Sequence, residues 1–447
     1  MAWSVRIAGW WDDLRDSLWF LPAVVVAAAV VLSVLLVALE PAPSWVPELV
    51  LFGGTPDGAR TILSELAGAT ITVVGLVFSL TVVALQMASS QFTPRLLRTF
   101  LRDRGVQIVL SVMIASAVFD VILLTSVRSS GDGVDAFVPR LAVSAALLLA
   151  GAAVALLVYF LHHVTQSLRV DVIIRSISQQ TLQQIGAADP GRHELPDQDP
   201  PDPPEDAFVV TARGDGYLQL VDEEVLAEAC RRLGYRVRIR PTLGEWVSTG
   251  TTLAWAWPDG SKEAGDHDEL RTRLHRGLHL GKDRTESSDL AFGIRQLQDI
   301  ALRALSSGVN DPSTAGIVTT QLSVIMVALA DRPLGASLLL DEDGELRVAI
   351  PRPTFPAFLE LVVGPIRRNA TKELAVLLTT VSLLTDVAER VADSADRAAS
   401  VEDQLDRLVE QADLDDATDR AALEQAAEIV RSTLRHGTRP GAAPTAS

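Results

Sequence analysis

Residues 66–104 read LAGATITVVGLVFSLTVVALQMASSQFTPRLLRTFLRDR, and this stretch decides the class of fold. It carries no charged side chain from Ala67 to Thr93. A membrane-crossing helix needs about 20 predominantly apolar residues, whereas an uncharged run of this length is unusual in a helix of a soluble core. The stretch therefore predicts a transmembrane helix. It ends in a basic turn that carries Arg95, Arg98, Arg102 and Arg104.

Small and polar side chains recur along this predicted helix at positions i, i+4, i+7, i+11 and onward, which places them on one face. We call this face the seam; it consists of Gly68, Thr72, Gly75, Ser79, Val82, Gln86 and Ser89. Two explanations stay open. Small residues four positions apart let membrane helices pack closely, and a polar seam also suits the lining of a water-filled path in an oligomer.

The composition describes a chain that is part membrane protein and part water-soluble protein. Of its 447 residues, 48% are hydrophobic and 21% are charged, and the mean hydropathy is +0.25. Most long apolar runs precede residue 165, and most of the charge follows it. The net charge of −17 argues against a nucleic-acid partner, which requires a basic surface. The single cysteine, Cys230, rules out an intramolecular disulfide and fits a reducing compartment.

Three further apolar runs predict membrane helices. They cover residues 19–39, 106–127 and 141–162, and with the opening stretch they form a predicted four-helix transmembrane domain over residues 1–165. Arginine is concentrated in the turn between the second and third spans, whereas the loops on the other side contain few. By the positive-inside rule, we expect both termini and everything after residue 165 to be cytoplasmic.

One ionisable residue, Asp120, lies inside a predicted span. Charged groups at this depth are costly and usually face a bundle interior or water, so Asp120 is a candidate functional residue. Because the second and third spans are predicted to be antiparallel neighbours, we expect Thr72 at a similar depth. A Thr72/Asp120 pair could hold a cation or a proton; the alternative is a protonated or hydrogen-bonded structural aspartate.

Beyond the membrane domain, the sequence predicts a cytoplasmic α+β region. Proline and acidic residues after a helical extension predict a linker, alternating apolar residues predict a small β module, and a mixed domain with long C-terminal helices follows. The predicted parts are a helical extension and linker at 166–206, a β module at 207–260, a mixed helical domain at 261–436 with a β-hairpin near 337–350, and a disordered tail at 437–447.

The β module resembles the barrel-sandwich fold of biotinyl and lipoyl domains. The resemblance rests on a turn that joins two strands and contains Gly244, Glu245, Val247, Gly250 and Leu253. The segment contains no lysine, so we do not expect a carrier role. A structural or ligand-sensing module is the remaining interpretation.

The densest signature is RTESSDLAFGIRQLQDIALRALSSGVNDPSTAG, residues 284–316. Most of it has a structural explanation: it predicts a helix up to Ser306, then a stop at Gly308 and a new helix capped by Asp311 and opened by Pro312. The remaining polar residues form a candidate ligand pocket. They are Arg284, Asp289, Arg295, Gln296, Asn310 and Asp311.

The signature, the four spans and the segment ALQMASSQFTPR together resemble an uncharacterised family of bacterial predicted membrane proteins, a domain of unknown function. The resemblance covers nearly the whole chain. It implies a multi-pass protein of the bacterial plasma membrane, and it implies no established activity.

The function classes can be ranked by what the sequence contains. It has no nucleotide-binding loop, no nucleophile elbow and no cysteine pair, so we expect no enzyme, no cofactor and no metal site. The leading hypothesis is a homo-oligomeric channel or transport protein whose second span lines the path, with the basic turn at its cytoplasmic mouth. The alternative is a non-conducting membrane scaffold or signalling protein. Either would contact the lipid bilayer and further copies of itself.

Overall fold

The chain divides into two compact units, Met1–Val172 and Ile173–Ser447, each described here by itself. The structure is a computed structural model. It describes residues 20–40, 47–48, 51–91, 103–129, 136–167, 169–187, 193–194, 197–260, 265–282, 284, 289–341 and 343–436. The predicted disordered tail, residues 437–447, lies outside them.

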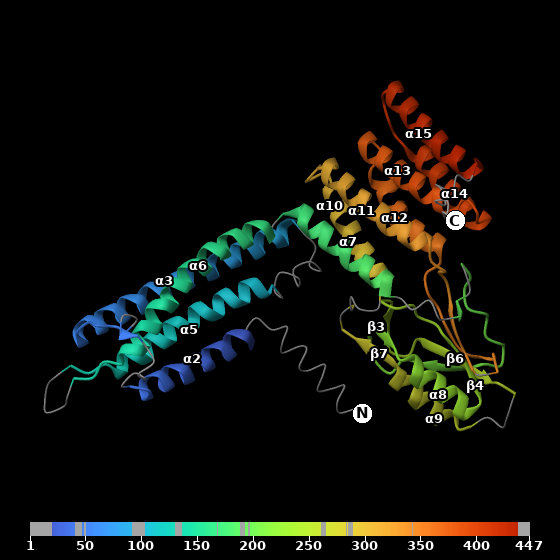
Figure 1. The fold of residues 1–447 in the computed structure, drawn as a ribbon. Helices are drawn as coiled ribbons and strands as arrows, with labels where there is room; N and C mark the ends of the chain where they lie inside the picture. Colours follow the sequence, from blue (N-terminus) through green and yellow to red (C-terminus); the bar gives the residue numbers. More distant parts are fainter. Residues whose placement is uncertain are drawn as a thin grey trace, which may run out of the picture. The chain divides into compact units, whose positions relative to one another are not determined.

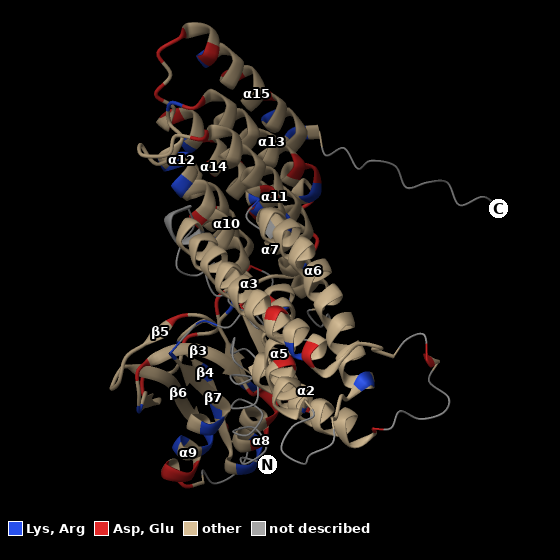
Figure 2. Ribbon diagram, turned by 90° about the vertical axis from the view of Figure 1, so that its left-hand side faces the viewer, with Lys and Arg blue, Asp and Glu red and all other residues tan. Residues whose placement is uncertain are grey.

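The described part of the first unit is built from long apolar helices that run alongside one another (Figure 1). They are α2 (Phe20–Ala38), α3 (Pro56–Gln91), α5 (Arg104–Ser126) and α6 (Arg140–Ser167). Figure 2, coloured by residue type, shows far fewer charged residues along these helices than on the helices of the second unit. Each one is long and apolar enough to cross a membrane.

Helix α3 begins ten residues before the stretch that predicted it. Pro56 occupies its first turn, and the Gly58 amide donates to Thr55 Oγ1 at 3.2 Å. Proline suits this position because the first amides of a helix have no partner within the helix. The helix therefore starts in a polar segment that hydrophobicity alone does not reveal.

Helix α5 is the centre of the first unit and packs against α2, α3 and α6. Two apolar clusters hold the helices together. One includes Leu63, Phe119 and Ala142, and the other includes Val77 and Phe160.

The second unit contains two sheets in its described residues. The six-stranded sheet has the order β1-β8-β9-β4-β6-β2, and the three-stranded sheet has the order β5-β3-β7. The strands are β1 (His193–Glu194), β2 (Phe208–Thr211), β3 (Gly216–Val221), β4 (Tyr235–Ile239), β5 (Trp246–Val247), β6 (Thr252–Pro258), β7 (Leu278–Gly281), β8 (Ser337–Leu340) and β9 (Leu346–Ile350). Both sheets share one core with α8 (Glu223–Leu233) and α9 (His267–Gly277).

The predicted hairpin near residues 337–350 is confirmed as β8 and β9, but the boundary predicted at residue 260 does not separate it from the β module. Strand β9 pairs in parallel with β4, with Val348 opposite Val237. An unpaired β4 edge would leave backbone amides and carbonyls without partners, and the hairpin supplies them.

The described part of the predicted linker is anchored in the second unit. The Asp197 carboxylate accepts the Phe355 amide at 2.8 Å and pairs with Arg397 Nε at 2.5 Å. Arg397 also donates to the Ala330 carbonyl at 2.8 Å. A charged residue is buried here because each of its donors finds an acceptor. The division between the units lies at Val172, inside α7 (Val170–Ala187) and within the predicted extension and linker at 166–206.

The rest of the second unit is helical (Figure 1). Its helices are α10 (Leu290–Ala304), α11 (Pro312–Ala330), α12 (Phe355–Asn369), α13 (Leu374–Val391), α14 (Ala395–Gln411) and α15 (Ala417–His436). Helix α11 is a fifth helix that is long and apolar enough to cross a membrane, where the sequence predicted four spans. It packs against α10, α12 and α13, so its apolar character also suits a helical core.

Candidate functional site

The seam lies on the free face of α3. Its described side chains are all exposed: Gly68, Thr72, Gly75, Ser79, Val82 and Gln86. The buried residues of α3 lie on another face, which includes Leu63, Ala67 and Val77. A Cβ atom added at Gly68 or Gly75 would meet nothing within 4 Å. Within one chain, the described seam therefore does not pack against α2, α5 or α6.

Two predicted parts of the membrane site are only partly described. Ser89 lies in α3, but its side chain is outside the described residues, as are Arg95, Arg98 and Arg102. Arg104 is the first residue of α5 and is exposed. It follows the N-cap residue Asp103, which accepts the Gly105 amide at 2.8 Å and pairs with His163 of α6 at 2.7 Å. The cytoplasmic mouth stays a prediction.

The predicted Thr72/Asp120 pair is not formed. Asp120 is completely buried, and neither of its carboxylate oxygens has a hydrogen-bond partner among the described residues. Thr72 is exposed, and its hydroxyl donates to the Gly68 carbonyl at 2.9 Å. Residues two positions apart on a helix point in nearly opposite directions. Thr70, not Thr72, is therefore the buried threonine of α3.

In the second unit, three residues of the signature gather at the start of α10. Asp289 is the N-cap and accepts the Ala291 amide at 3.0 Å. Arg295 Nη1 lies 3.4 Å from the Asp289 carboxylate. Burial raises the pKa of Asp289, although Arg295 and Arg284 oppose this effect. The predicted grouping of Arg284, Asp289 and Arg295 is therefore found.

The β module contributes residues to this cluster that sequence reasoning did not place there. The Arg284 guanidinium lies 5.2 Å from the centre of the Tyr217 ring. Gly244 has φ +77°, and a Cβ atom there would overlap the Asp289 carboxylate. Glycine is required for both reasons. Gly244 was recognisable only as a turn residue, because nothing in the sequence links that turn to residue 289.

The structure does not bring Asn310 and Asp311 to this cluster. Gln296 is buried within α10. Asn310 and Asp311 follow the far end of α10, and a helix of 15 residues separates its ends by about 22 Å. Asp311 caps α11 by accepting the Thr314 amide at 3.1 Å, and its hydrogen bonds with Thr314 lower its pKa. Asn310 takes the left-handed conformation, with φ +49°.

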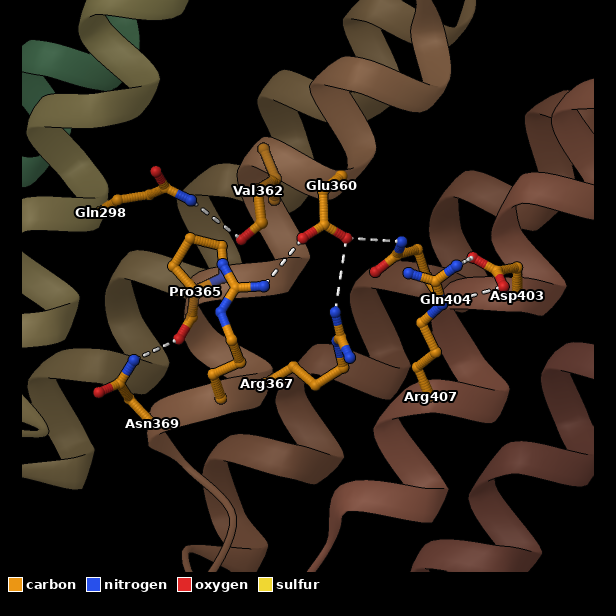
Figure 3. Close-up of polar contacts among 10 residues, drawn as sticks. Gln298, Glu360, Val362, Pro365, Arg367, Asn369, Asp403, Gln404 and Arg407 are labelled. Carbon is orange, nitrogen blue, oxygen red and sulfur yellow. Dashed lines mark hydrogen bonds and ion pairs between the residues drawn. The ribbon is translucent and has the colours of Figure 1, made fainter.

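Helix α10 also joins other helices of the second unit. A Cβ atom at Gly293 would overlap the Thr181 side chain of α7. Gln298 donates to the Val362 carbonyl of α12 at 3.3 Å, and Glu360 of the same helix accepts Gln404 of α14 at 2.9 Å (Figure 3). These contacts explain much of the signature as packing. No group of three or more metal-binding side chains occurs among the residues that the structure describes.

These features define a membrane protein with several apolar helices and a separate α/β unit. The chain belongs to the DUF2254 family of predicted membrane proteins, which it matches over residues 15–386. It is 37% identical over 432 residues to uncharacterised proteins of Mycobacterium bovis and Mycobacterium tuberculosis, covering 96% of this chain and 82% of each relative. No solved structure matches.

Proposed function

We propose that this membrane protein assembles into a homo-oligomer through the seam of α3, and that the assembled seams line a conduction or transport path. The observation that carries the proposal is the exposure of every described seam residue within a single chain. Lipid favours large apolar side chains on an exposed helix face, as at Leu76 and Phe78. Glycine, threonine, serine and glutamine on the neighbouring face instead suit contact with another α3 or with water.

The spacing of the seam supports association of several α3 helices around one axis. Its positions alternate by four and three residues, an average of 3.5. An apolar or small-residue repeat of 3.5 makes straight helices coil around each other with a left-handed supercoil. From Gly68 to Ser89 the seam extends about 32 Å, close to the roughly 30 Å thickness of the hydrocarbon layer.

The orientation follows from the arginine distribution. The turn that contains Arg95, Arg98, Arg102 and Arg104 would face the cytoplasm, at the mouth of the path. Both termini and the second unit would then be cytoplasmic, and the protein would lie in the bacterial plasma membrane. The second unit would serve assembly or sensing. The proposal assigns the chain no catalytic activity and no cofactor.

The alternative is a non-conducting scaffold or signalling protein. It is favoured by the pairs Gly68/Thr72 and Gly75/Ser79, because small residues four apart allow helices to approach closely. In this case the seam would pack tightly against the seams of other copies and leave no water-filled space.

Substitution of Gly75 by leucine distinguishes the two functions. Oligomeric state is measured by native mass spectrometry and ion flux by recording from proteoliposomes. A lined path predicts an intact oligomer with reduced flux for Gly75→Leu, whereas pure packing predicts dissociation. Gly151→Leu on α6 is the matched control, because Gly151 is also exposed with nothing within 4 Å of an added Cβ atom.

The proposal fails if the wild-type protein is monomeric in lipid. It also fails if the oligomer passes no ion or small solute under voltage, under membrane tension or with the substrates tried. An oligomer without flux that dissociates on Gly75→Leu assigns the scaffold.

A further inference from the structure

A polar layer lies inside the first unit where its two apolar clusters meet. Along α5, Met113 belongs to one cluster and Phe119 to the other. Ser116 and Asp120 lie beside this junction, one helical turn apart and therefore on the same face. Both are completely buried. Thr70, exposed by only 7%, lies on the packed face of α3 between Leu63 and Val77, which belong to the two clusters.

The polar side-chain atoms of α5 in this layer have no partners among the residues that the structure describes. The Ser116 hydroxyl and both Asp120 carboxylate oxygens are buried without a hydrogen bond to any described residue. An ionised carboxylate in such surroundings loses its hydration and gains nothing in return. The Asp120 carboxylate therefore needs either a proton that neutralises its charge or a bound group that donates hydrogen bonds or positive charge to it.

No charged side chain of the packed helices faces this layer in the described residues. Helix α2 has none. The charged residues of α3, Asp57, Arg60 and Glu65, are all exposed, and Arg140 at the start of α6 donates to the Phe52 carbonyl at 2.7 Å. Helix α5 itself carries only Arg104 besides Asp120, about 24 Å away along the helix axis. His163 is paired with Asp103 at the same end of α5 as Arg104. No described ionisable group therefore supplies a counter-charge to Asp120. The unpaired atoms of the layer are all oxygens, and a carboxyl and a hydroxyl can hold a proton between them.

We propose that Asp120 and Ser116 form a proton-binding site inside each subunit, with Thr70 as the polar residue that α3 contributes to the same layer. Uptake converts the Asp120 carboxylate and one proton from water into a carboxyl group. Rotation of the two side chains then brings its O–H to Ser116 Oγ, a bond that they do not make in the described structure. Release returns the proton to water and restores the carboxylate. The site lies within one chain and does not depend on the seam, so it could be present in a channel or in a scaffold.

Infrared difference spectroscopy of the full chain in lipid vesicles tests the site, because a protonated carboxyl has its own C=O band. The wild-type protein is titrated from acidic to alkaline buffer, in H2O and in D2O. We expect a buried carboxyl band that disappears in alkali, is lost in Asp120→Asn and shifts in Ser116→Ala. The Glu65→Gln variant is the control, because Glu65 is an exposed carboxylate of the same unit; it should retain the band.

Three results would overturn the proposal. The first is the absence of a band that depends on Asp120 at every pH. The second is a band that persists in alkali, which would describe a permanently neutral structural aspartate. The third is a band abolished by Na⁺ at constant pH, which would assign a metal cation instead. If Asp120→Asn does not fold, the shift expected for Ser116→Ala still decides, and an unshifted band contradicts the site. Flux measurements on the seam are independent of all three.

Discussion

Asp289 is a residue whose role depends on burial as much as on its charge. Sequence reasoning selected it as a polar member of the signature, and its position predicted the start of a helix. The structure makes it the N-cap of α10 and adds the contact with the Gly244 turn, which removes the carboxylate from water. The desolvation was not predictable because the turn is more than forty residues away in the chain.

Replacement of Asp289 by asparagine should remove the free-energy cost of burying a charged carboxylate. It should also keep the cap, because asparagine is an equally good N-cap residue. A carboxyl whose pKa is raised on folding stabilises the folded state below its unfolded pKa, and this contribution is lost as the pH rises. We therefore expect Asp289→Asn to be as stable as the wild type or more stable at pH about 7, with the advantage disappearing below the usual aspartate pKa of about 4. Thermal unfolding as a function of pH measures it; a constant difference would contradict the assignment.

Thr70 and Thr72 also show, within one helix, that the sequence does not reveal which residues are buried by distant parts of the chain. Helical spacing correctly placed Gly68, Thr72 and Gly75 on one face, because that face depends only on 3.6-residue geometry. Spacing does not say whether a face points to the neighbouring helices. That choice depends on which side of α3 the helices α5 and α6 occupy.

At the scale of elements, α7 and α10 approach each other closely where Gly293, which has no side chain, faces Thr181. Gly293 leaves room for Thr181, whose hydroxyl donates to the Ile177 carbonyl of its own helix at 2.8 Å. The glycine of FGIRQL thus has a packing role that no local signal reveals, since a glycine inside a helix is otherwise unfavourable.

A double-mutant cycle tests this contact. Gly293→Ala should cost about 1 kcal/mol or more through overlap, which lowers the unfolding temperature by roughly 2–4 °C. Adding Thr181→Ala to the Gly293→Ala chain should restore the lost stability, with a coupling energy of about 0.5–3 kcal/mol. Gly316→Ala on α11 is the control, because the nearest atom to its added Cβ lies 3.9 Å away. If Gly293→Ala costs no more stability than Gly316→Ala, and if its effect simply adds to that of Thr181→Ala, the two helices are not in contact at this position.

At the scale of the whole molecule, the two units have separate cores, and α11 belongs to the second. Its length and composition would also permit a membrane span. The two interpretations differ in what the second unit does alone, because a spanning helix would expose a large apolar surface to water.

We expect a fragment of residues 173–436 to fold and remain in the supernatant after ultracentrifugation, with the circular dichroism of a mixed α/β protein. The fragment of residues 1–172 is the matched control and should sediment with membranes. A second-unit fragment that requires detergent would make α11 a fifth span and would place the C-terminus on the other side of the membrane.

The class of this protein can be inferred from the chain alone. Apolar runs, the arginine-rich turn, helix caps and the hairpin near residues 337–350 are local signals, carried by residues within about one element of each other. The packing of those elements brings together residues far apart in the chain. It left the seam free, buried Asp120 beside Ser116, paired β9 with β4 and divided the signature residues between two places. Local signals predict these elements, but only contacts between distant residues determine which of their faces are covered.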